Sequence, residues 1–121
     1  MDSIDMRTFA RGAGTTVSFP PGAMVFKEGD PGDHMYVVQS GVIEMVIHDK
    51  VVDTCGENEA LGFMSVLDGE PRTATARVKE TAEVSIIDQR RFRFMVDEVP
   101  NFASYIMLAM AHRIRGMKAV I

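Results

Sequence analysis

Turns rich in glycine and proline divide most of this chain into short segments. Residues 20–22, Pro-Pro-Gly, separate segment 15–19 from segment 23–27, and residues 28–33 contain two glycines and a proline. Such stretches favour turns, and short segments bounded by them are typical of strands. The spacing of these turns therefore predicts a largely β structure.

Alternation along the segments supports this interpretation. Ile43, Met45 and Ile47 share one face of segment 42–48, as expected for a half-buried strand. A short helix is expected at 63–67. Seven or eight short strands with turns between them favour a jelly-roll sandwich or barrel. The strands are expected at 15–19, 23–27, 34–40, 42–48, 51–55, 74–79 and 83–86. Gly41 is expected to join the third and fourth of these strands.

The period becomes helical from Asp88 onward. Asp88 is expected to cap a helix that runs to about Val96, Pro100 to end it, and Asn101 to cap a longer helix toward Lys118. That helix carries two apolar stripes, so we expect one side to pack on the barrel and the other on a second subunit, with docking of both on the barrel as the alternative. The stripes are Ile106, Met110, Ile114, Met117 and Ile121, and Phe102, Tyr105 and Ala109.

The length of 121 residues predicts one domain over 1–121. We expect an N-terminal helical segment at 1–14, with Ser3 as the cap of a helix over 3–11, a β-barrel at 15–87, and C-terminal helices at 88–121. No apolar run is long enough for a membrane helix and no secretory leader is visible, so we expect a cytoplasmic protein.

Charge and reactive residues exclude several functions. The net charge of −4 disfavours direct nucleic-acid binding. His34, His48 and His112 are scattered and have no catalytic partner at a suitable spacing, and the lone Cys55 reads as a small core residue. We therefore expect no enzyme activity, no metal site and no cofactor.

Residues 61–76 contain the pattern that points to a function. Gly62 opens the short helix, and Arg72 stands at the start of a strand otherwise made of small residues. Amide groups at a helix start attract anions, and the planar guanidinium of arginine matches a phosphate. These residue types together predict a phosphate pocket, with an ion pair between Arg72 and Asp53 or Asp68 as the alternative.

This segment resembles the phosphate-binding cassette of the cyclic nucleotide-binding domain family, to which catabolite activator protein and the regulatory subunit of protein kinase A belong. The family pattern is roughly Phe-Gly-Glu-x-Ala-Leu, a spacer, then Pro-Arg-(Ala/Ser/Thr)-Ala-(Thr/Ser). Residues 29–41 also resemble the glycine-rich turn and strand of that family, and the similarity runs from about Ser3 to Lys118. It implies a double-stranded β-helix (jelly-roll) barrel followed by two C-terminal helices.

The resemblance also implies roles for individual residues. Phe63 stands where the family usually has a glutamate that accepts a hydrogen bond from the ribose 2′-hydroxyl, and Ser65 replaces the usual alanine. A carboxylate at position 63 is therefore expected to tighten nucleotide binding. The cyclic phosphate is expected to contact Gly62, the amides of Phe63 and Met64, Arg72 and Thr73, with Arg113, Ile114 and Met117 reaching the base.

The function implied is a ligand-sensing regulatory domain. It would bind cAMP, cGMP or a related phosphate ligand in the barrel and relay binding through the C-terminal helices. The alternative is a degenerate domain without nucleotide affinity that serves as a dimerisation or interaction module.

Overall fold

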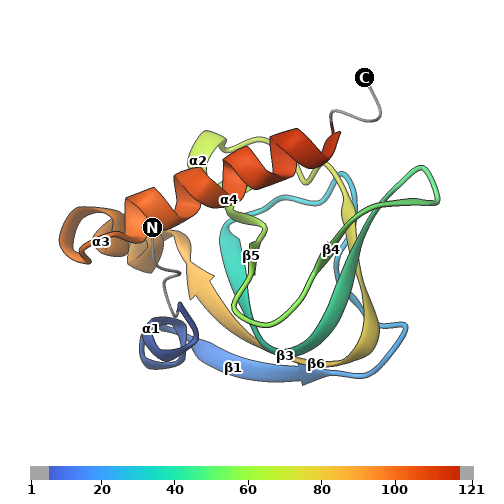
Figure 1. The fold of residues 1–121 in the computed structure, drawn as a ribbon, viewed down its shortest axis with the longest axis horizontal. Coiled ribbons are helices and arrows are strands. Elements are labelled where there is room, and N and C mark those ends of the chain that lie inside the picture. The colour runs from blue at the N-terminus through green and yellow to red at the C-terminus, as the bar shows by residue number, and fades with distance from the viewer. Residues whose placement is uncertain (1–5, 118–121) are drawn as a thin grey trace.

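The computed structural model describes residues 6–117, and its six strands form one sheet that curls into a barrel (Figure 1). Helices α3 and α4 follow the last strand, and α4 lies across one side of the barrel. The predicted fold class, a mainly β jelly-roll barrel with two C-terminal helices, is confirmed. The elements are α1 (Met6–Ala13), β1 (Thr15–Phe19), β2 (Met24–Phe26), β3 (His34–Ile47), β4 (Lys50–Cys55), β5 (Ala60–Leu61), α2 (Phe63–Asp68), β6 (Thr75–Asp88), α3 (Gln89–Glu98) and α4 (Phe102–Met117).

Two long strands form the frame of the barrel. The predicted break at Gly41 is wrong, because β3 continues through it and pairs antiparallel with β6 on both sides. Gly41 has φ +94°, and a Cβ there would lie 2.2 Å from the carbonyl oxygen of Thr81. Glycine thus permits a bulge that bends the strand without ending it. The predicted strands at 74–79 and 83–86 likewise form one strand, β6.

The buried apolar residues form two clusters, one inside the barrel and one between the barrel and the helices. The first includes Phe26, Ile43 and Val84, and the second includes Phe63 and Phe102. Cys55 is 1% exposed in the barrel cluster, as predicted for a small core residue.

The helix ends match the sequence only in part. The Asp88 carboxylate accepts a hydrogen bond from the Arg91 amide at 2.8 Å, so the predicted cap of α3 is confirmed. Asn101 instead adopts a left-handed conformation with φ +71° between α3 and α4, which is not the extended conformation of a cap residue. The start of α1 is capped by Asn58, whose Oδ1 accepts from the Met6 amide at 2.7 Å. Ser3 lies outside the described residues.

Helix α4 packs the N-terminal part of both predicted stripes against its own chain. Phe102 and Ile106 are 0% and 3% exposed, and Tyr105, Ala109 and Met110 pack around them. The expectation that α4 also packs on a second subunit stays a prediction. Apolar side chains exposed on α4 are Met107, Leu108 and Ile114, of which Ile114 belongs to a predicted stripe, while the side chain of Met117 and residues 118–121 lie outside the described part.

Candidate functional site

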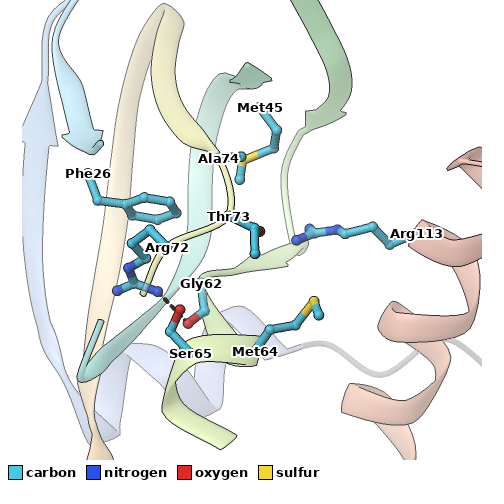
Figure 2. A pocket seen from close by; sticks show the side chains of 9 residues that line it. All are labelled: Phe26, Met45, Gly62, Met64, Ser65, Arg72, Thr73, Ala74 and Arg113. Atoms are coloured by element: carbon cyan, nitrogen blue, oxygen red, sulfur yellow. Dashed lines mark hydrogen bonds between the residues drawn. The ribbon is translucent and has the colours of Figure 1, made fainter. Parts of the chain in front are cut away.

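A cleft of about 280 Å³, open to solvent, lies where α2 begins (Figure 2). Its walls come from the ends of several strands, from the start of α2 and from α4, so only the folded barrel brings them together. Four of the predicted ligand residues line it, Gly62, Met64, Arg72 and Thr73, as do the predicted Ser65 and Arg113. The remaining lining residues are Phe26, Met45 and Ala74.

Gly62 turns the chain from β5 into α2. It has φ +79°, a left-handed conformation that L side chains rarely adopt. A Cβ at this position would lie 2.7 Å from Nη1 of Arg72 and 3.3 Å from the rings of Phe26 and Tyr36. The absence of a side chain therefore lets the backbone of the turn lie directly against the arginine.

Arg72 is buried in the wall of the cleft, with only 5% of its surface exposed. Its Nη1 donates to the carbonyl oxygen of Gly62 and its Nη2 to that of His34, both at 2.6 Å. The guanidinium carbon lies 4.2 Å from the centre of the Phe26 ring. Burial lowers the pKa of Arg72, and the nearby Tyr36 and Asp33 act in the opposite direction.

The guanidinium of Arg72 is incompletely satisfied. Among the described residues, its Nε is the one buried side-chain nitrogen or oxygen without a hydrogen-bond partner. An unpaired buried donor costs about 1–3 kcal/mol, so such a group points to a missing acceptor. The alternative ion pair with Asp53 or Asp68 is wrong, because Asp53 pairs with Arg113 and Asp68 accepts from the Glu70 amide.

Phe63 does not face the cleft. Its side chain is 0% exposed and belongs to the core cluster under the helices, and it is not among the residues that line the cleft, in contrast to the other predicted residues around it. The backbone of Phe63 still begins α2 beside Gly62. A carboxylate introduced here would enter the core, and the expected gain in nucleotide binding loses its structural basis.

Arg113 reaches the cleft from α4, as Figure 2 shows. Its Nε lies 3.3 Å from Oδ2 of Asp53, and its Nη2 donates to the carbonyl oxygen of Ala60 at 3.2 Å and to Sγ of Cys55 at 3.6 Å. Its guanidinium carbon lies 5.2 Å from the centre of the Phe63 ring. The neighbouring Ile114 points into solvent, 66% exposed, and does not line the cleft.

Several residues of the site carried no signal in the sequence. Phe26 and Met45 read only as strand residues, and Ala74 matched the cassette pattern without an assigned role, yet all three line the cleft. Asp53 lies on the predicted strand 51–55, and its pairing with α4 depends on how that helix crosses the barrel. A residue's neighbours in sequence do not reveal such contacts, which join positions far apart in the chain.

Among residues 6–117, no three histidine, cysteine, aspartate or glutamate side chains come close enough to hold a metal ion. His34 contacts Asp33 at 2.7 Å, and His48 lies 3.8 Å from Glu28. No helix in this part of the chain is both long and apolar enough to cross a bilayer.

A β-barrel with an arginine-walled cleft and two C-terminal helices is the architecture that the sequence resemblance implied, and comparison with known proteins identifies the family. The family model for the cyclic nucleotide-binding domain matches residues 16–99. The chain belongs to the cyclic nucleotide-binding domain family, as its sequence resemblance predicted.

Two curated relatives and one solved structure illustrate the similarity. The chain is 32% identical over 88 residues to a cAMP-dependent protein kinase regulatory subunit of Emericella nidulans, covering 71% of this chain and 21% of the relative. It is 27% identical over 104 residues to a CRP-like cAMP-activated global transcriptional regulator of Mycobacterium tuberculosis, covering 82% and 46%. The chain thus spans less than half the length of either relative.

The structure of Sp-2Cl-cAMPS bound to PKAR CBD2 matches the fold with a TM-score of 0.78 at 19% sequence identity. The match covers 99% of this chain and 80% of that one.

Proposed function

We propose that this chain is a sensor domain that binds a cyclic nucleotide, cAMP or cGMP, or a related small phosphate ligand in the cleft. The observation that carries the proposal is Arg72, a buried guanidinium in the cleft wall whose Nε has no partner among the described residues. The family membership and the cAMP-linked names of the relatives agree with this ligand class.

The phosphate would lie between Arg72, Thr73 and the start of α2. Arg72 uses one N–H of each Nη group for backbone carbonyls, and its Nε–H, which has no partner among the described residues, remains for an anion. The left-handed turn at Gly62 allows the amides of Phe63 and Met64 to be approached closely. Thr73 is exposed on the lining and would add a hydroxyl.

Relay of binding would run through α4. Arg113 connects this helix to the cleft lining, and the Tyr105 hydroxyl donates to the Asn58 carbonyl at 2.8 Å in the loop before β5. Asn58 also caps α1. A ligand that shifts the start of α2 or attracts Arg113 would change these contacts and bias the position of both terminal helices.

Calorimetric titration with cAMP and with cGMP tests this proposal. Thr73→Val removes a hydroxyl from an exposed position without disturbing the core, and we expect it to weaken binding severalfold. Arg72→Lys keeps the charge but loses the planar fork, so binding should fall at least about tenfold. Arg77→Ala is the control, because Arg77 pairs with Glu44 outside the cleft and should bind as the parent does.

Thermal melting of each variant verifies folding before titration. If neither nucleotide binds the folded parent at millimolar concentration, the sensor proposal is wrong. Equal affinities of the parent and the folded Thr73→Val and Arg72→Lys proteins would also overturn it, because the cleft would then not be the binding site.

The second candidate is a domain without nucleotide affinity that acts as an interaction module. Two observations favour it. Phe63 fills the core where the family pattern has glutamate, and α4 exposes Met107, Leu108 and Ile114 at 57%, 50% and 66%. Exposed apolar side chains grouped on one helix are typical of an interface, here a homodimer through α4. Light scattering measures the molar mass in solution. If it gives the mass of one chain at every concentration, with and without nucleotide, the dimer is excluded.

A further inference from the structure

We propose that Arg113 determines ligand specificity, by offering hydrogen-bond donors where the family pattern provides a carboxylate acceptor. The domain would then recognise the oxygen of the ribose 2′-hydroxyl as a hydrogen-bond acceptor, and would not depend on the proton of that hydroxyl. This inference rests on the proposed function, because it concerns the chemistry of the same cleft.

The cleft lining contains two arginines and no carboxylate. None of the nine described residues that line it is aspartate or glutamate. The side chain at position 63, where a glutamate would stand in the family pattern, is turned into the core. A hydroxyl that donates its proton therefore finds no charged acceptor on this wall.

Arg113 is held in place by contacts on one edge of its guanidinium. Asp53 contacts Nε, and the Ala60 carbonyl and Cys55 Sγ contact Nη2. The centre of the Phe63 ring lies 5.2 Å from the guanidinium carbon, and the ring packs against the face of the guanidinium. Phe63, which stands where the family pattern has a glutamate, therefore helps to position Arg113. This arrangement fixes the side chain before a ligand arrives, which lowers the entropy lost on binding.

The remaining nitrogen, Nη1, carries two N–H groups and has no partner among the described residues. Figure 2 shows the guanidinium extended from α4 toward the side of the cleft formed by Thr73 and Gly62. Arginine has no acceptor atom and can only donate. Any hydrogen bond from Nη1 to a ligand therefore requires an acceptor oxygen or an anionic group on that ligand.

A ribose 2′-hydroxyl is both donor and acceptor, so chemical analogues separate the two possibilities. A 2′-O-methyl group keeps the acceptor oxygen and removes the proton, whereas a 2′-deoxy sugar lacks both. With arginine at the sugar, the 2′-O-methyl analogue should bind about as well as the parent nucleotide and the 2′-deoxy analogue about tenfold more weakly. With a carboxylate acceptor, both analogues would lose affinity.

The test is a titration of the parent, Arg113→Ala and Arg115→Ala with cAMP, its 2′-deoxy analogue and its 2′-O-methyl analogue, and with the corresponding cGMP series. Arg115 is an exposed arginine on the same helix and outside the cleft, so its removal is a matched charge control. We expect Arg113→Ala to abolish the preference for 2′-O-methyl over 2′-deoxy, and Arg115→Ala to retain it. The readout is a ranking of ligands, which a loss of helix stability alone would not change.

Two results would overturn the inference while leaving the proposed function intact. One is a parent that binds nucleotide but treats the 2′-O-methyl analogue as poorly as the 2′-deoxy analogue. The other is a ranking that survives in Arg113→Ala. If the folded parent binds none of the ligands, the proposed function fails, and the inference fails with it.

Discussion

Phe63→Glu is the substitution for which sequence and structure predict opposite results. The sequence pattern predicts a restored carboxylate acceptor and tighter nucleotide binding. In the structure, the Phe63 ring is 0% exposed in the core between the barrel and the helices. Loss of a phenylalanine from such a site costs about 3–5 kcal/mol of unfolding free energy.

A buried carboxyl group adds to this loss. A polar group buried without a partner costs about 1–3 kcal/mol, and the contact between the Phe63 ring and Arg113 is removed as well. The total of about 4–8 kcal/mol is at least half of the stability of many domains, for which about 5–15 kcal/mol is usual. We therefore expect the Phe63→Glu protein to lose most of its free energy of unfolding, and we do not expect it to bind nucleotide more tightly than the parent.

Urea unfolding followed by circular dichroism measures the effect. Met64→Glu is the matched control, because Met64 is the next residue on α2, is 43% exposed, and should change stability by no more than about 0.5 kcal/mol. Phe63→Leu keeps an apolar side chain and should cost less than about 1.5 kcal/mol.

The dependence on pH gives a second measurement. Burial raises the pKa of an introduced carboxyl group, so the folded Phe63→Glu protein retains a proton that the unfolded chain releases. Its deficit relative to Met64→Glu should be smallest below the usual pKa of glutamate, where only the pH-independent loss of the ring and the burial of a neutral carboxyl remain, and should grow as pH rises past it. If Phe63→Glu unfolds at the same urea concentration as Met64→Glu, the Phe63 ring is not a core group, and the expectation of tighter nucleotide binding is restored.

Two further predictions follow from single contacts. Burial raises the pKa of Cys55 to about 12, so the native protein should react with an alkylating reagent at mildly alkaline pH about a thousandfold more slowly than the unfolded chain; equal rates would show that Cys55 is not buried. Gly62→Ala places a Cβ at φ +79° and 2.7 Å from Nη1 of Arg72, so we expect it to lower the unfolding free energy by about 1–2 kcal/mol and to weaken nucleotide binding. Urea unfolding and calorimetry on this variant measure both effects, and a Gly62→Ala protein that matches the parent in both would contradict the geometry described for this turn.

The local pattern of the sequence determined the class of fold and the position of the phosphate segment. Turns of glycine and proline and period-two alternation depend on short-range backbone preferences, which act wherever those residues stand. The cap at Asp88 was predictable for the same reason, because it involves residues three apart. The break expected at Gly41 was wrong because pairing with β6 continues through the bulge, a long-range contact that outweighs the local preference of glycine.

Only the tertiary structure decided which way the functional side chains face. Phe63 occupies a position that the family pattern assigns to the ligand, yet its ring turns into the core because α3 and α4 provide an apolar surface there. Arg72 contacts carbonyl oxygens contributed by β3 and by the turn before α2, and Arg113 reaches Asp53 sixty residues away in sequence. Burial and hydrogen bonding depend on segments that meet only when the barrel closes and α4 crosses it. The residue types of the site could therefore be read from the sequence, whereas their orientation could not.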